Sequence, residues 1–165
     1  MKRFLILCFV CLPVVASAQK ILTGDLKFLN TEHKLHTIVD FSQTRLIGEQ
    51  ENDTSFIHAF IAADSTLLLK RFYAGVVDEL ENRYMLIGNQ PEAKYKAVIH
   101  IQQVANDGRT WSVVDFSSRE TNENLCTIRI VGDGGRIGTF LSLWGDGLRD
   151  TGEQLGKLIK KNTKK

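Results

Sequence analysis

The sequence predicts an α+β fold, in which an antiparallel or mixed sheet of four to five strands packs against two helices. Several segments alternate apolar and polar residues and are separated by turn residues, which is typical of strands with one buried face. Two other segments repeat apolar residues at helical spacing, a central one at about 65–82 and a C-terminal one at about 134–161. The order of these segments predicts strand, helix, strands, helix.

Residues 1–18 have the layout of a secretory signal peptide. Lys2 and Arg3 precede an apolar run at 4–15, and three small residues at 16–18 provide a cleavage site after Ala18. The run is shorter than the roughly 20 residues that a membrane-spanning helix needs. We expect a periplasmic or secreted protein with a single domain at 19–165 and no transmembrane span after cleavage.

The alternatives for residues 1–18 are a retained anchor and a lipoprotein. The cysteines of the run, Cys8 and Cys11, do not follow the usual pair of small residues, which argues against lipidation. Removal of Lys2 and Arg3 takes the formal charge from +2 to 0, and this argues against a nucleic-acid partner. Cys126 alone remains after residue 18, and we expect it to be a buried, inert thiol.

The N-terminal part of the mature chain contains one predicted strand. Residues 19–34 show no clear period, whereas 34–44 alternate, with Leu35 and Val39 on one face and Asp40 on the other. Helical spacing begins at Ser55. A continuous helix would bring Asp64 onto its buried face, and an unpaired buried carboxylate is costly, so a break is expected near residue 63. The second helix is then predicted at 65–82.

The predicted sheet continues after this helix. A short apolar run at 84–87 ends in a turn, and alternating segments follow at 95–104, 110–117 and 125–131. Asn106, Asp107 and Gly108 form a hairpin turn between the first two, because these residues accept positive φ.

The glycine-rich stretch at 131–161 is predicted to be a packing helix rather than a ligand loop. Its glycines lack the spacing of a dinucleotide-binding turn, no second parallel strand follows, and its carboxylates do not match a calcium loop. We therefore expect no cofactor and no metal here. As a helix capped by Asp133, the stretch places five glycines in one lane: Gly134, Gly138, Gly145, Gly152 and Gly156.

Such a lane lets another backbone approach closely. Its partner is this protein's own sheet or first helix, a second copy of the chain, or another envelope protein. Gly147 lies outside the lane and is expected to tolerate alanine. A break of the helix at 145–147 remains an alternative.

No catalytic motif is present, and the four histidines do not have zinc-ligand spacing. We therefore expect no catalytic residues, and a non-enzymatic protein that acts through protein–protein interaction or assembly, with self-association through the C-terminal helix as one form. The alternative is a small-ligand-binding protein or an unrecognised hydrolase with a cleft near Asp40 and Asp115. A third is a membrane-active C-terminal helix, suggested by Phe140, Leu143, Trp144 and the lysine-rich tail.

Five segments carry a resemblance that spans residues 35–161: "GVVDELENRYMLIG", "YKAVIHIQQV", "NDG", "WSVVDFSS" and "GEQLGKLIKK". Their order resembles the small α/β domains of bacterial envelope proteins, namely the TolB amino-terminal domain, the curli secretion lipoprotein and the lipoprotein activators of peptidoglycan synthases. The sequence is also similar to uncharacterised secreted proteins of Bacteroidetes-type bacteria. The resemblance implies a binding or assembly module and supplies no catalytic residues.

Overall fold

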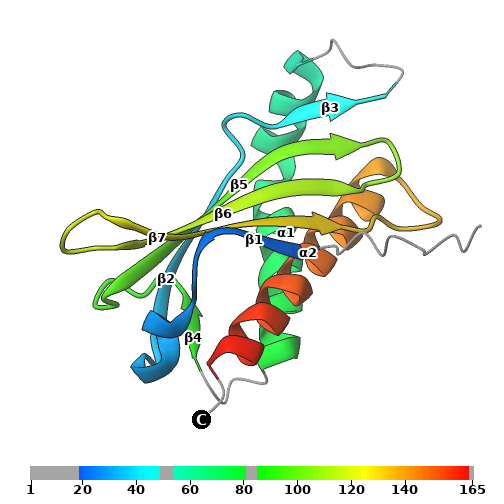
Figure 1. Cartoon of the computed structure of the whole chain (residues 1–165). Coiled ribbons are helices and arrows are strands. Elements are labelled where there is room, and N and C mark those ends of the chain that lie inside the picture. Colours follow the sequence, from blue (N-terminus) through cyan, green and yellow to red (C-terminus); the bar gives the residue numbers. More distant parts are fainter. Residues whose placement is uncertain (1–18, 49–53, 81–84, 164–165) are drawn as a thin grey trace, which may run out of the picture.

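Two long helices lie together on one face of a seven-stranded mixed sheet in the computed structural model, which describes residues 19–48, 54–80 and 85–163 (Figure 1). The predicted α+β class is confirmed, and the sheet has more strands than the four to five expected. The predicted signal peptide lies outside the described residues.

The sheet joins an antiparallel half to a parallel half. Its strands are β1 (Gln19–Gly24), β2 (Lys34–Asp40), β3 (Arg45–Ile47), β4 (Leu86–Gly88), β5 (Tyr95–Ala105), β6 (Thr110–Ser118) and β7 (Asn124–Gly132). The order is β1-β7-β6-β5-β2-β4, and β3 pairs with β5 as well. β1, β7, β6 and β5 pair antiparallel, whereas β2 and β3 run parallel to β5, and β4 runs parallel to β2.

Residues 19–34, for which no element was predicted, form the edge strand β1 and the short 3-10 helix η1 (Lys27–Thr31). Most side chains of β1 are exposed or half-buried, so the strand has no buried face that would produce a period of two. Its position comes from pairing with β7. Leu26 and Leu29, before and within η1, are fully buried and extend the core at this end.

The central helix α1 (Thr54–Leu80) is longer than predicted and has no break near residue 63. Asp64 is only half-buried, so its carboxylate reaches solvent and the cost that predicted the break does not arise. The buried positions of the second half, Leu68, Phe72 and Val76, recur every four residues and face the core.

The C-terminal helix α2 (Phe140–Asn162) starts six residues later than predicted and runs without a break through residues 145–147. Thr139, rather than Asp133, caps it, with its Oγ1 accepting a hydrogen bond from the backbone N–H of Ser142 at 3.4 Å. Ile137, which a helix starting at residue 134 would place near Leu141 and Trp144, lies in the preceding loop and is 91% exposed.

The core lies between the two helices and the sheet. Trp144, Leu148 and Leu155 of α2 are fully buried and meet Ile99 and Ile128 of the sheet in one hydrophobic cluster. Neither helix is apolar enough over a sufficient length to cross a membrane, among the residues described.

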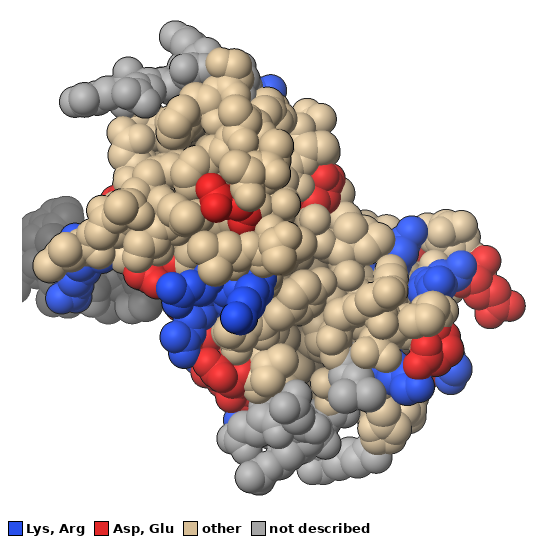
Figure 2. Space-filling view, turned by 180° about the vertical axis from the view of Figure 1, so that it is seen from behind, with Lys and Arg blue, Asp and Glu red and all other residues tan. Residues whose placement is uncertain are grey.

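The surface seen from behind the view of Figure 1 has no broad region of one charge. Basic and acidic residues lie interleaved there and are separated by wide areas of other residues (Figure 2). Several surface charges are paired, such as Arg149 with Asp78 at 2.8 Å and Lys157 with Glu79 at 3.5 Å.

Candidate functional site

The sheet face opposite the helices carries a row of polar and charged side chains. Along β5, Ala97, Ile99 and Ile101 are buried towards the helices, so the residues between them lie on the other face. The same alternation in β2, β6 and β7 places polar and charged side chains on this open face. No helix of the described residues covers it (Figure 1).

Strand register arranges the open face in rows that cross the strands. One row contains Arg45 of β3, Gln103 of β5 and Trp111 of β6, which are successive cross-strand partners. A second row contains Asp40, His100, Val113, Arg129 and Lys20, which are successive cross-strand partners on β2, β5, β6, β7 and β1. Residues that are far apart in the sequence therefore become neighbours on one surface.

A β-bulge in β5 sets the composition of the first row. The register with β6 shifts between Ile101 and Gln103. Ile101 and Val104 are both buried, so the two residues between them, Gln102 and Gln103, are both exposed. A bulge inserts one extra residue and redirects side chains. Here it places two consecutive amide side chains on the open face.

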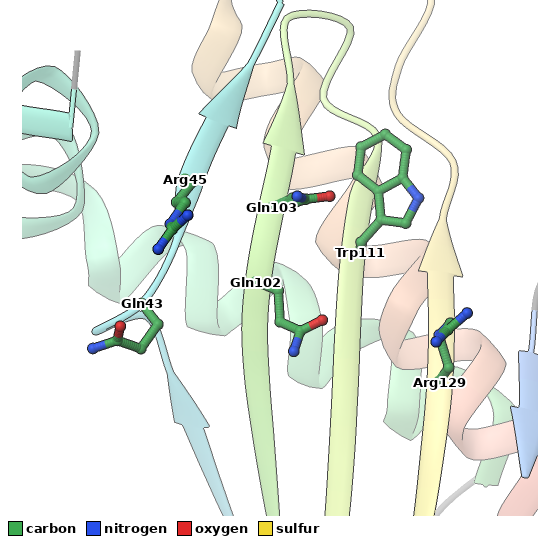
Figure 3. Close-up of a pocket in the computed structure, with 6 residues that line it drawn as sticks. All are labelled: Gln43, Arg45, Gln102, Gln103, Trp111 and Arg129. Atoms are coloured by element: carbon green, nitrogen blue, oxygen red, sulfur yellow. The ribbon is translucent and has the colours of Figure 1, made fainter. Parts of the chain in front are cut away.

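These residues form a pocket of about 510 Å³, lined by Gln43, Arg45, Gln102, Gln103, Trp111 and Arg129. Figure 3 shows the two glutamines of β5 and the indole of Trp111 between Arg45 and Arg129. Both guanidinium groups are exposed, and neither has a carboxylate partner within 4.0 Å among the described residues. The pocket thus has a guanidinium group at each end and an aromatic ring with amides between them.

A polar chain runs across the strands beside this pocket. Nδ1 of His100 lies 3.0 Å from Oδ2 of Asp40, and its Nε2 lies 3.6 Å from Oδ2 of Asp115. Thr127 donates from its hydroxyl to Oδ1 of Asp115 at 2.6 Å. Asp40 and Asp115 lie on the same face, and His100, which the sequence did not connect with them, stands between them.

The carboxyl group of Asp40 is held in its ionised form. The backbone N–H of Ser42 donates to Asp40 at 2.9 Å, and this bond is the largest cause that keeps the pKa of Asp40 below its ordinary value of 3.8. The Ser42 side chain and His100 lower the pKa further, and burial opposes them. Asp40 therefore accepts hydrogen bonds at neutral pH and is not a proton donor.

The chain of polar residues lacks the parts of a catalytic or metal centre. His100 is held between two carboxylates, and no serine or cysteine lies in hydrogen-bond contact with it in the described part of the chain. The same residues contain no group of three or more His, Cys, Asp or Glu side chains that could hold a metal ion. The arrangement holds these polar side chains in place beside the pocket.

The five glycines of the predicted lane do not form one surface. Gly152 and Gly156 pack against α1, and a Cβ on Gly152 would lie 2.2 Å from the carbonyl oxygen of Phe72. Gly145 faces the side chain of Arg71, and a Cβ on Gly145 would lie 3.3 Å from Cγ of that arginine. The helical part of the lane therefore faces this protein's own first helix.

The other two glycines of the lane precede α2. A Cβ on Gly134 would lie 1.9 Å from the carbonyl oxygen of Asp107, and Gly138 has a φ of +144°. Gly147, which was placed outside the lane, is buried, and a Cβ there would lie 2.0 Å from the carbonyl oxygen of Gly108. The expectation that Gly147 tolerates alanine is therefore reversed, because the hairpin turn fills the space.

No motif in the sequence marks the pocket residues as a group. One signal was present: the apolar spacing of β5 changes from two residues to three between Ile101 and Val104, which marks a bulge. No comparable signal connects Arg45 with Arg129. They meet on one surface only because β3 and β7 belong to the same sheet.

No protein-family model matches the chain, and no curated protein sequence matches it. Among solved structures, it is similar to the PelC dodecamer from Paraburkholderia phytofirmans, with 10% identity and a TM-score of 0.42 over 85% of this chain and 97% of that chain. A single-substitution variant of the same dodecamer has 14% identity and a TM-score of 0.36 over the same shares.

Proposed function

We propose that this protein is a non-enzymatic binding module of the periplasm or the cell exterior, and that the open face of its sheet binds an anionic ligand. The layout of residues 1–18 supports the compartment. The pocket at Arg45 and Arg129 supports the ligand class. The proposal agrees with the binding or assembly role that the envelope-domain resemblance implies.

The observation that carries the proposal is the pair of guanidinium groups at opposite ends of the pocket, without carboxylate partners among the described residues. A guanidinium presents a rigid fork of N–H donors that matches a carboxylate or a phosphate. Gln43, Gln102 and Gln103 add amide groups, which donate and accept hydrogen bonds.

A hydrolase at Asp40 and Asp115 has less support. The low pKa of Asp40 removes it as a general acid at neutral pH, and His100 has carboxylates on both sides instead of a nucleophile. We therefore assign Asp40, His100 and Asp115 a supporting role, in which they fix the surface beside the pocket.

Self-association is the second candidate, and the edge strand β1 favours it. β1 pairs with β7 on one side, and no strand of the described residues pairs with its other side. An unpaired strand edge can pair with another chain. Because α1 occupies the glycine face of α2, we place such an interface at β1 rather than at the C-terminal helix. Light scattering across a range of protein concentrations tests it, and a monomer throughout would contradict it.

The ligand proposal is tested by titrating the mature protein with citrate and with inorganic phosphate while nuclear magnetic resonance follows the indole N–H of Trp111. We expect a saturable shift that weakens as salt is added. Replacement of either arginine, Arg45→Gln or Arg129→Gln, should weaken binding roughly threefold to tenfold, since an exposed charge-assisted contact contributes about 0.5–1.5 kcal/mol.

The matched control is Arg136→Gln, which removes the same charge from an exposed loop position outside the pocket. It should leave the titration unchanged. If all three variants weakened binding equally, the affinity would depend only on net charge, and the pocket would not be the anion-binding site.

A further inference from the structure

The pocket is wider than one anionic group. Arg45 lies on β3 and Arg129 on β7, with β5 and β6 between them. Neighbouring strands are about 4.8 Å apart, so three steps separate the two strand axes by roughly 14 Å. A ligand that contacts both guanidinium groups as they stand must be extended across the strands and must carry an anionic group near each end.

The residues between the two arginines suit a ring that carries hydroxyl groups. Trp111 is half-buried and lies between Gln103 and Arg129, so part of its indole surface is open to the pocket (Figure 3). An aromatic ring buries apolar surface well, and the C–H faces of a sugar ring supply such surface. Gln102 and Gln103 are both exposed because of the bulge, and each amide can donate to one hydroxyl group and accept from another.

The charge beside the pocket restricts how densely charged the ligand can be. Asp40 lies in the row of Arg129, and Asp115 lies one row further along the same face. A polymer with an anionic group on every unit, such as a nucleic acid, would bring charges against these carboxylates. A ligand with widely spaced anionic groups meets the two arginines and avoids this repulsion.

We infer that the pocket binds a chain of sugars that carries carboxylate groups, an acidic polysaccharide, laid across strands β3, β5, β6 and β7. This inference rests on the anion-binding function proposed above. The two arginines bind carboxylates of the chain, Trp111 stacks on a sugar ring between them, and the glutamines bind its hydroxyl groups.

The test is calorimetric titration of the mature protein with glucuronic acid and with oligosaccharides of increasing length in which glucuronic acid alternates with a neutral sugar. We expect affinity to rise by about tenfold or more from the monomer to the first oligomer long enough to reach both arginines, since a second charge-assisted contact forms without a second association step. Neutral maltose oligomers of the same lengths should bind at least about tenfold more weakly than the acidic ones.

Three variants separate the contributions. Trp111→Ala should weaken binding of the acidic oligomer about tenfold. Trp111→Phe should retain most of the affinity because it keeps an aromatic ring. In Arg129→Gln, the dependence of affinity on oligomer length should disappear. Thermal unfolding of each variant serves as the folding check, and Arg129 is exposed and outside the core.

The outcomes distinguish this inference from the proposed function. Binding of glucuronic acid that depends on the arginines, without any gain with length, would overturn the polysaccharide inference and leave the anion site standing. Equal or tighter binding of polyglutamate or single-stranded DNA would also overturn it and would assign the site to another polymer. Equal binding of neutral and acidic oligomers would overturn the anion site itself.

Discussion

Gly75 and Gly152 lie where α1 and α2 touch backbone to backbone. A Cβ on Gly75 would be 2.0 Å from the carbonyl oxygen of Arg149, and a Cβ on Gly152 would be 2.2 Å from the carbonyl oxygen of Phe72. Each glycine therefore leaves space for the backbone of the other helix. The close approach brings Trp144 and its neighbours on α2 into the core, where they are fully buried.

Replacement of either glycine by alanine should destabilise the fold. The new methyl group has no flexible side chain to displace, so the helices must move apart, and overpacking of this kind costs about 1–3 kcal/mol. The higher helix propensity of alanine offsets at most about 1 kcal/mol of this loss of stability. We expect a net loss for Gly75→Ala and Gly152→Ala, and for the larger Gly152→Leu, measured as a lower denaturant midpoint at unchanged slope.

The control at the same interface is Gly145→Ala. Its Cβ would meet Cγ of Arg71 at 3.3 Å, and that side chain can shift by a few tenths of an ångström. The change in stability should therefore stay within about 1 kcal/mol in either direction. Equal losses at Gly145 and Gly152 would contradict the account of the helix contact.

Gly147→Ala tests the contact between α2 and the hairpin turn of β5 and β6. The Cβ would lie 2.0 Å from the carbonyl oxygen of Gly108 and 2.8 Å from Oγ1 of Thr110. Since the turn must move, we expect a loss of about 1–3 kcal/mol in chemical unfolding, comparable to that of Gly152→Ala. An alanine variant as stable as the natural protein would show that α2 does not press on this turn.

Asp40→Asn should change how stability depends on pH. The pKa of Asp40 is lower in the folded protein than its ordinary value of 3.8, which applies to the unfolded chain. The ionised carboxyl group therefore stabilises the fold above pH 3.8, and this stabilisation is lost as the pH falls through the folded pKa. The group is partly exposed, so the loss at neutral pH should stay below about 1 kcal/mol.

Thermal unfolding from neutral pH into the acid range measures this effect. The asparagine variant should lose less stability than the natural protein between 3.8 and the most acidic condition. Parallel stability curves for the two proteins would show that the bond from Ser42 to Asp40 does not depend on the charge of the carboxylate.

Cys126 should resist thiol reagents while the protein is folded. It is fully buried in β7, and burial, with a smaller effect of Asp25 and Asp115, raises the pKa of its thiol to about 11. The reactive thiolate is therefore scarce at neutral pH. Labelling by an aromatic disulfide reagent should become fast only across the unfolding transition. Rapid labelling of the native protein would mean that β7 opens locally.

Asp40 and Asp115 were named only as candidates for a cleft, on condition that both faced it. They share a face because each is mid-strand on the side opposite the buried residues. The role of His100 between them required the register of β5 against β2 and β6. The glycine lane was drawn on an ideal helix from residue 134, and it lost Gly134 and Gly138 because the helix starts at Phe140.

By itself, the sequence determined the class of the fold, the strands β2, β5, β6 and β7, and the amphipathic helices, because these depend on local periodicity. Features that depend on contacts between residues far apart in the sequence were decided only by the tertiary structure. β1 is a strand because β7 offers it an edge, and α1 continues past Asp64 because solvent reaches that carboxylate. Arg45, Trp111 and Arg129 line one pocket because three strand pairings bring β3, β5, β6 and β7 together on one face. No local sequence pattern predicts these pairings.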